Sequence, residues 1–574
     1  MVNEEKNKSP KKRSLRKQDF IQLLLGIGII VFINIISNYV FTRFDLTSEK
    51  RYTLSPATKD ILKKLDDVVY VKVYLEGEFP SGFKNLRNSA KEMLDEFRAY
   101  AGDNLQYEFI NPNANPDKKE RDKLQAQLMD EGLKPWNIEA GDKGTKSTIP
   151  VFPAALFTYK SETRKYPVQL LQDKLLGTAQ EKLNGSIEGL EYQFAKAIKQ
   201  LTTSMKPKIA FIDGHGELDT MQTADITTYL LDFYNVERKK INGKLNSLAG
   251  YKAIIIAKPD SAFSEQDKFV IDQFVMKGGK VLWFLDRMRA SMDSLAGKKE
   301  MVSTDLDVNL EDILFRYGVR INPCLVQDLS CVPIRVITGK LGDRDKYEWI
   351  PWVYFPLSFP TINHPIVNNL DGIKFQFAST IDTVKAPGIK KTALLTTSGF
   401  AKVMFPPVDV STNIMGQTPD KSKYTEQFKP LAVLLEGEFT SNFKNRIPHS
   451  ISSDSAIDFR EKSIPNKMLV VADGDVIRNE ANKAKGAIIP LGYDFQRSQI
   501  WGNRDFILNA VDYLCDESGL ISVRSKELKL HLLDKTKVEA ERTKWQMINL
   551  LVPSLFIVVF GLIRYYLRRR RYAR

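Results

Sequence analysis

Hydrophobic residues form two long uncharged runs near the ends of the chain and many shorter runs between them. Residues 20–41 form a run of 22 residues without a charge, and residues 545–563 form a second of 19. A helix rises about 1.5 Å per residue, so roughly 20 apolar residues cross the ~30 Å hydrocarbon core of a membrane. Both runs therefore predict transmembrane helices. A buried core helix is the alternative, and the Lys/Arg clusters that flank both runs argue against it.

The first apolar run also raises the alternative of a cleavable signal peptide. The run is long for the hydrophobic part of such a peptide, and no A-x-A-like cleavage site follows it. There is no cysteine before Cys324, so a lipid-modified N-terminal cysteine is excluded. We therefore interpret residues 20–41 as an uncleaved signal anchor.

The chain after the first run has the pattern of a small α/β domain, which we place at residues 42–205. The β-branched and aromatic run 68–75 predicts a strand, and apolar positions at helical spacing predict a helix over 81–100. A second strand is expected at 105–110 and a β-hairpin over 155–170. This order predicts a βαβ unit with an antiparallel extension.

Residues 206–520 have the pattern of a larger α/β domain with insertions. Between 208 and 285 the elements alternate as strand, helix, strand, strand, helix, strand, and the strands are continuously apolar. Such strands are typical of a parallel sheet with helices on both faces. We therefore predict a Rossmann-like or flavodoxin-like parallel-sheet domain. Further strands at 393–397, 431–435 and 468–472 and a helix at 505–515 fit the same sheet or its extension.

One segment of this larger domain lacks a clear period. Residues 340–365 are rich in proline and aromatic side chains, including Trp349, Trp352 and Tyr354. We interpret the segment as an insertion or interface loop. Exposure of its aromatic residues would indicate a partner surface, and burial would indicate core packing.

The net charge of +14 first suggests a nucleic-acid partner, but its distribution excludes that interpretation. The first 17 residues carry seven Lys or Arg against two Glu, and residues 564–574 carry six Arg. The middle of the chain is therefore nearly neutral. By the positive-inside rule, both basic tails lie in the cytoplasm. Two spans then place residues 42–544 in the periplasm, anchored to the inner membrane, with lipid as a partner and no nucleic acid. The remaining segments are a tail at 1–19, a membrane-proximal linker at 521–544 and an Arg-rich tail at 564–574.

Acidic side chains and a histidine follow two of the predicted strands. Asp213, His215 and Glu217 belong to the sequence Asp-Gly-His-Gly-Glu, and Asp473 and Asp475 follow a later strand. Ligands of open α/β sheets bind at the carboxyl ends of the strands, so these five residues are candidate ligand- or partner-binding groups. The alternative is a structural turn whose side chains bind the backbone. Other polar residues could join the second group in space: Arg478, Asn479, Asn503, Arg504 and Asp505.

Several motifs are absent from the sequence, and their absence limits the function. There is no phosphate-binding GxxxxGK[ST] loop, no GxGxxG after a strand, no GxSxG and no HExxH. We therefore predict no catalytic residue, no metal and no cofactor. Cys324 and Cys331 could form a disulfide or remain buried thiols, and the sequence leaves both possibilities open.

The chain resembles the GldG family of membrane-anchored auxiliary subunits of the ABC transporter associated with gliding motility in Bacteroidetes. The resemblance covers essentially the whole chain, and it depends on the order of several short motifs between the two spans. These are Arg43–Thr47, Lys50–Ser55, Gly214–Glu217, Leu434–Gly437 with Phe439, Val471–Asp475, and Gly502–Asn503 with Phe506. It implies a separate ABC permease and a separate ABC ATPase as partners, in agreement with the missing phosphate-binding loop. The domain with Gly214–Glu217 is also similar to a module of an intraflagellar-transport subunit.

Three hypotheses follow for the function. The first is a non-enzymatic, substrate-binding-like accessory subunit of an inner-membrane ABC transporter, which binds an unknown substrate or an envelope protein. The second is a membrane-tethered scaffold of envelope or gliding machinery without a transported ligand. The third is an envelope hydrolase that uses Asp213, His215 and Glu217.

Overall fold

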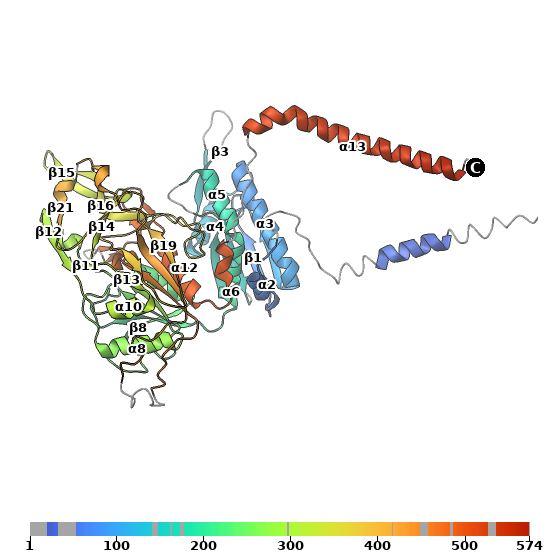
Figure 1. Ribbon diagram of the computed structural model, residues 1–574. Coiled ribbons are helices and arrows are strands. Elements are labelled where there is room, and N and C mark those ends of the chain that lie inside the picture. Colours follow the sequence, from blue (N-terminus) through green and yellow to red (C-terminus); the bar gives the residue numbers. More distant parts are fainter. Residues whose placement is uncertain are drawn as a thin grey trace, which may run out of the picture. The chain divides into compact units, whose positions relative to one another are not determined.

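The computed structural model contains two large β-sheets that pack against helices, several smaller β-sheets and a long C-terminal helix (Figure 1). It describes residues 20–32, 53–140, 147–160, 164–172, 177–295, 298–415, 417–447, 457–482, 486–525 and 535–572. By internal contacts, residues 1–53 form one unit and residues 54–574 another.

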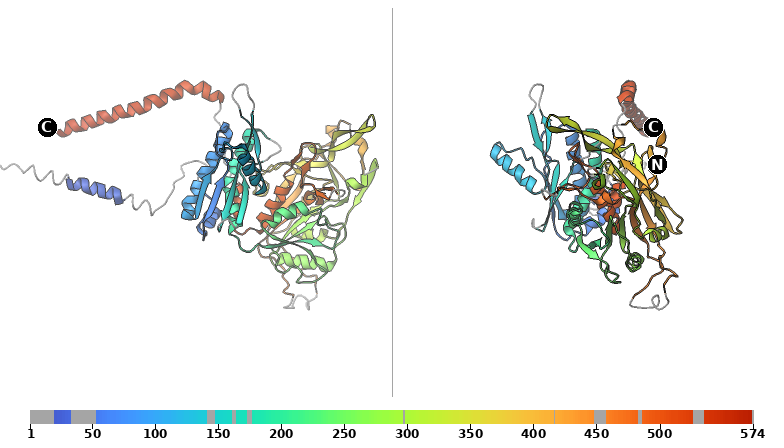
Figure 2. Two further views of the ribbon diagram at one scale, coloured as in Figure 1. Left: turned by 180° about the vertical axis from the view of Figure 1, so that it is seen from behind. Right: turned by 90° about the vertical axis from the view of Figure 1, so that its left-hand side faces the viewer.

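The first sheet has four strands in the order β2-β1-β5-β6. β1 pairs parallel with β2 and antiparallel with β5, and the predicted hairpin is present as β5 and β6. The blue helix α3, alongside these strands in Figures 1 and 2, buries Leu86, Ala90, Leu94 and Phe97 in the core of this sheet. The elements of this region are α2 (Pro56–Lys63), β1 (Val69–Val73), α3 (Ser81–Ala101), β2 (Leu105–Phe109), α4 (Lys118–Asp130), β3 (Trp136–Ala140), β4 (Ser147–Val151), β5 (Ala154–Tyr159), β6 (Arg164–Gln169), α5 (Ala179–Glu188) and α6 (Leu190–Thr202).

The second sheet has seven strands in the order β19-β22-β23-β10-β9-β7-β8. The five from β23 to β8 are parallel, whereas β22 runs antiparallel to both of its neighbours, β23 and β19. The prediction of a parallel sheet is therefore corrected to a mixed one, because apolar content does not encode strand direction. The strands are β7 (Lys208–Asp213), β8 (Asn235–Lys240), β9 (Ala253–Ala257), β10 (Lys280–Phe284), β19 (Ile389–Thr396), β22 (Pro430–Gly437) and β23 (Asn466–Val471).

Helices cover both faces of this sheet, which explains why its central strands are apolar throughout. Side chains alternate between the faces of a strand, so Ile209 and Phe211 of β7 join one core, and Ala210 and Ile212 join the other. The first core includes α7 (Ala224–Leu231) and α12 (Asn503–Cys515). The second includes α8 (Glu265–Met276) and α10 (Glu311–Tyr317).

Apart from β19, the chain between β10 and β22 forms several small antiparallel sheets. The 340–365 segment, predicted as a loop, is largely a strand of a long hairpin, β15 (Cys331–Leu341) and β16 (Arg344–Ser358). Trp352 is 0% exposed and Tyr354 is 1% exposed, so this part of the segment is core. Cys324 and Cys331 are both free thiols in the structure. The other strands are β11 (Met288–Arg289), β12 (Glu300–Asp305), β13 (Val319–Ile321), β14 (Leu325–Asp328), β17 (Ile373–Lys374), β18 (Ile381–Thr383), β20 (Ala401–Met404) and β21 (Val408–Ser411).

The two predicted spans are represented differently in the structure. Within the described residues, Ala540–Arg570 of α13 (Lys535–Tyr572) is the one helix long and apolar enough to cross a membrane. Its 31 residues contain the predicted span 545–563. Near the other end, Phe20–Phe32 is a shorter apolar helix. Residues 33–41 of the predicted first span lie outside the described part of the chain. These two helices fit a membrane-anchored protein.

Candidate functional site

The predicted Asp213–Glu217 loop leaves β7 at the carboxyl edge of the seven-stranded sheet. β8 pairs with one side of β7, and the next strand, β9, pairs with the other side, so the direction in which strands are added changes at β7. Ligands of open α/β sheets bind at such a switch point. Asp213, however, has a partner within the fold. Arg238 of β8 donates from Nε to Asp213 Oδ2 at 2.9 Å and from Nη2 to Oδ1 at 2.5 Å. The carboxylate is thus held by a two-pronged guanidinium contact.

His215 lies between two carboxylates and a phenyl ring. Its Nδ1 is 3.0 Å from Glu217 Oε1, and its Nε2 is 3.2 Å from Asp267 Oδ2 at the start of α8. The imidazole stacks on Phe263 with 3.6 Å between ring centroids. Both ring nitrogens therefore have acceptors, and the His215 side chain is buried.

The loop backbone is fixed to the segment after β9. The Asp260 and Ser261 amides both donate to the His215 carbonyl at 3.0 Å. Gly216 has a φ of 73°, a conformation that glycine adopts most readily, and a Cβ there would lie 1.7 Å from Asp260 Oδ1, so a larger residue would displace the Asp260 side chain. These contacts give the loop a structural role. Ligand binding by Asp213, His215 and Glu217 stays a prediction.

His215 is expected to make the stability of the protein depend on pH. Burial lowers the pKa of His215, but the hydrogen bonds and charges of Glu217 and Asp267 outweigh it and raise the pKa above its usual 6.5. A raised histidine pKa contributes stability that is complete below pH 6.5 and is lost as pH rises through the higher folded-state value. Denaturant unfolding of wild type and His215→Gln from about pH 5.5 to about pH 8.5 should show their gap shrinking with rising pH. A gap that stays constant across this range would contradict the prediction.

A buried charged cluster lies at the same edge of the sheet, where β9, β10 and β23 end. Lys258 follows β9, and its Nζ forms ion pairs with Asp286 Oδ2 at 3.0 Å and with Asp475. Arg478 Nη1 contacts Asp475 Oδ1 at 3.1 Å. Asp473 accepts from the amides of Gln376 at 2.5 Å and Asp475 at 2.7 Å. The structure therefore brings the two predicted acids together with two cations that follow neighbouring strands or turns.

The cluster contains more acidic than basic groups, and this shifts its protonation. Burial, with the charges of Asp475 and Asp286, raises the pKa of Asp473 well above its usual value. Burial also raises the pKa of Asp286, and the charge of Lys258 opposes that rise. Burial lowers the pKa of Lys258, but the surrounding carboxylates outweigh it and raise the pKa. Lys258 thus stays charged and compensates the acids around it.

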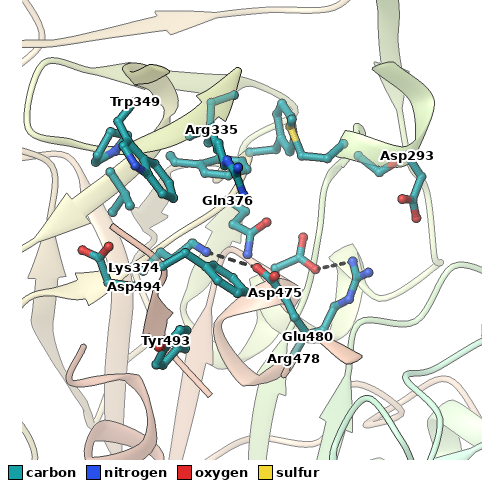
Figure 3. A pocket seen from close by; sticks show the side chains of 18 of the residues that line it. Asp293, Arg335, Trp349, Lys374, Gln376, Asp475, Arg478, Glu480, Tyr493 and Asp494 are labelled. Atoms are coloured by element: carbon teal, nitrogen blue, oxygen red, sulfur yellow. Dashed lines mark hydrogen bonds and ion pairs between the residues drawn. The ribbon is translucent and has the colours of Figure 1, made fainter. Parts of the chain in front are cut away.

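One face of the cluster borders a cavity of about 590 Å³. This volume is within the ~300–1,000 Å³ range of small-molecule and cofactor pockets. Figure 3 shows Lys374, Gln376, Asp475 and Arg478 gathered in the cavity, with Trp349 nearby. Of the five predicted binding residues, only Asp475 lines this cavity. Its aromatic lining consists of Trp349, Phe355, Phe377, Tyr493 and Phe495.

Several polar residues have places that the sequence suggested only in part. Arg478 joins the cluster as expected, whereas Asn503 binds the backbone of Lys374 and Val476. Sequence reasoning missed Lys258 and Asp286, although both follow apolar strands at the carboxyl edge that already contained Asp213. The sequence around Lys374 and Gln376 contains no pattern that would predict a binding site there. Among the described residues, no group of three or more His, Cys, Asp and Glu side chains is placed to hold a metal ion.

The cavity and both loops lie in a segment that matches a known family. Residues 206–510 match the model of an ABC transport auxiliary family, described as "ABC-type uncharacterized transport system", and this match covers more than half of the chain. The chain belongs to this family. Membership in the ABC transport auxiliary family supports an accessory subunit that associates with ABC transporter components. Residues 48–158 match a second model, described as "Domain of unknown function (DUF7088)".

Two individual similarities accompany the ABC transport auxiliary family match. An "Uncharacterized protein" of Borreliella burgdorferi is 19% identical over 564 residues, which is 97% of this chain and 99% of the relative. Among solved structures, the "mmIFT52 N-terminal domain" is 14% identical with a TM-score of 0.30, covering 57% of this chain and 100% of that one.

Proposed function

We propose that this protein is a non-enzymatic, substrate-binding-like accessory subunit of an inner-membrane ABC transporter and that it binds a substrate or an envelope protein at the cavity beside Asp475. The family match over residues 206–510 carries this proposal. The cavity supports it further, since it lies within the matched segment and at the carboxyl edge of the sheet.

The proposal extends to the transporter and to the fold. The resemblance to the GldG family supports a transporter of the gliding-motility type, with a separate permease and a separate ATPase. The parallel strand order β8-β7-β9-β10-β23 corresponds to the flavodoxin-like order 2-1-3-4-5, so we assign that class to the parallel part of the sheet. Two spans with both termini in the cytoplasm would place residues 42–544 in the periplasm.

Partner proteins should co-purify with the full chain through its C-terminal helix. The apolar side chains of α13 are exposed, and its most apolar stretch is not covered by any other part of the structure that is described. We expect an ABC permease and an ATPase to be recovered with residues 1–574 in mild detergent, identified by mass spectrometry. A chain that ends at residue 534 should lose both. Recovery of neither protein with the full chain would falsify the accessory-subunit proposal and favour a scaffold without a transported ligand.

The third hypothesis, a hydrolase, receives less support from the geometry. Asp213 is held by Arg238, and both nitrogens of His215 face carboxylates within the fold. A general base needs a free nitrogen within hydrogen-bond reach of the proton that it removes. Our proposal is therefore non-enzymatic.

A further inference from the structure

β15 is an edge strand that borders the cavity. It pairs with β16 along one edge, and β17 pairs with the far end of β16. Within the part of the chain that the structure describes, no strand pairs with the other edge of β15. A long edge strand presents main-chain donors and acceptors that can pair with another chain. We call the unpaired side the outer edge of β15.

The register with β16 shows which main-chain groups point to the outer edge. Pro333 lies opposite Pro351, and neither has an N–H, so the two cannot form a hydrogen-bonded pair. The pairs alternate along an antiparallel ladder, and the register is regular from Pro333 to Ile337. Arg335 and Ile337 are therefore also non-hydrogen-bonded positions relative to β16, and their N–H and C=O groups point outward. The hydrogen bonds between described residues include none to these four outward groups.

The outer edge borders the cavity at Arg335, and Ile337 lies beyond the residues that line it. Four consecutive residues of β15, from Val332 to Arg335, line it. If one face of the hairpin bordered the cavity, only alternate residues would line it, because successive side chains point to opposite faces. Consecutive lining residues indicate that the edge itself borders the cavity. An occupant can therefore reach main-chain groups and cavity side chains together.

The cavity presents opposite charges to such an occupant. Arg335 and Asp293 both line it, and neither takes part in an ion pair within 4 Å among the described residues, although the charge of Asp293 acts on Arg478. The Arg335 guanidinium lies 3.9 Å from the ring centroid of Tyr347 and leaves its donors available. Lys374 and Arg478, in contrast, already pair with Glu480 at 3.5 Å and Asp475 at 3.1 Å. Figure 3 shows Arg335 and Asp293 at separate places along the cavity.

We propose that an extended peptide segment of a partner protein pairs with the outer edge of β15, with an acidic side chain beside Arg335 and a basic side chain facing Asp293. The inference rests on the proposed function, because it names the ligand class of the same cavity. Strand addition uses main-chain bonds for affinity and side-chain pockets for specificity. Outward N–H and C=O groups two residues apart match the repeat of an extended chain at ~6.6–6.8 Å, which a small solute lacks. Arg335 and Asp293, which lack an ion-pair partner within 4 Å among the described residues, favour a peptide with one side chain of each sign.

The test uses the full chain in detergent and a displayed library of random linear dodecapeptides. We expect selected peptides to carry both an acidic and a basic residue. Arg335→Ala removes the guanidinium and keeps the N–H, whereas Arg335→Pro removes both. Proline is compatible with an edge strand where its N–H would face away from the partner strand. The affinity of a selected synthetic peptide should fall several-fold in Arg335→Ala and at least about tenfold further in Arg335→Pro, since a tenfold loss corresponds to ~1.4 kcal/mol.

Two controls separate main-chain pairing from misfolding and from side-chain binding. Two N-methylated peptides are compared, one methylated at the odd-numbered amides and one at the even-numbered amides. Methylation of the amides that pair with β15 should abolish binding, and methylation of the other set should leave it unchanged. The protein is the same in both measurements. Asp293→Asn should weaken only peptides that carry the basic residue. Equal affinity of Arg335→Ala and Arg335→Pro, N-methylation effects without alternation, or no enrichment of any peptide would overturn the proposal. Failure here with intact co-purification of a permease leaves the accessory-subunit function in place.

Discussion

Replacement of Lys258 by methionine is expected to destabilise the protein by about 3–5 kcal/mol, because it leaves buried carboxylates without their cation. The Lys258 side chain is 18% exposed, and it contacts Asp286 and Asp475, which are 10% and 4% exposed. Methionine keeps the apolar part of the side chain, so the loss reflects the charge. Denaturant unfolding of the full chain at neutral pH gives the change in the free energy of unfolding.

The chain offers a matched control for this substitution at the other end of the same strand. Lys252 immediately precedes β9, as Lys258 immediately follows it, and Lys252 pairs with Glu517, whose side chain is 82% exposed. Exposed pairs contribute ~0–1 kcal/mol, so Lys252→Met should change little. A similar cost for both variants would contradict a special role for the buried cluster.

The loss in the free energy of unfolding caused by Lys258→Met should also depend on pH, because the neighbouring carboxyl groups titrate. The pKa values of Asp473 and Asp286 are already raised by burial, and loss of Lys258 raises them further. An acid with a raised folded-state pKa is least costly to the fold when protonated, and stability falls as pH rises through that pKa. The difference between wild type and Lys258→Met should therefore widen with rising pH.

Replacement of Asp512 by alanine is expected to cost about 3–5 kcal/mol, because it strands a buried ammonium group. Asp512 of α12 accepts from Lys196 of α6 at 2.9 Å and from the hydroxyls of Tyr192 at 3.3 Å and Tyr234 at 2.9 Å. Lys196 and Asp512 side chains are 19% and 15% exposed. The Asp512 carboxylate thus connects α6, which packs on the four-stranded sheet, to α12, which packs on the seven-stranded sheet. The free energy of unfolding measures the loss.

Asp516→Ala is the matched control, one turn further along the chain. Asp516 pairs with Lys199, one turn along α6 from Lys196, but the Lys199 side chain is 38% exposed and can be hydrated once its partner is removed. Asp516 also accepts from the Ser518 and Leu520 amides, which adds to the cost of its loss. We still expect Asp516→Ala to cost only about 1–2 kcal/mol, because Lys199 and these donors can be hydrated. If the two variants lose the same stability, burial of the Lys196–Asp512 pair is not what joins the two helices.

The repeating elements of the larger sheet were predictable because their signals are local. The alternation over 208–285 fixed β7, α7, β9, α8 and β10 closely, since a strand covered on both faces is apolar at every position. Direction is different. β22 reads like its neighbour β23 in sequence, yet it is antiparallel, because direction follows from the path of the connecting chain.

The candidate site was predictable only where a polar group directly follows an apolar strand. Asp213, Asp473 and Asp475 were found in this way, and Lys258 and Asp286 carry the same signal. The partners of Asp213 and His215 come from β8 and α8, so the pattern alone could not show that these groups are already bound. Lys374 and Gln376 reach the cavity from the short strand β17 and the segment after it, which carry no recognisable pattern.

By itself, the sequence determined the apolar C-terminal helix, the nearly neutral middle of the chain, the α/β alternation and the absence of common catalytic motifs. These depend on composition and on periods of two to four residues, which a chain shows before it folds. Only the tertiary structure decided which charges share the cavity, that Trp352 is core, and that β15 leaves an unpaired edge beside Arg335. These depend on contacts between residues more than a hundred positions apart, such as Lys258 with Asp475, and on a strand register that two opposed prolines reveal.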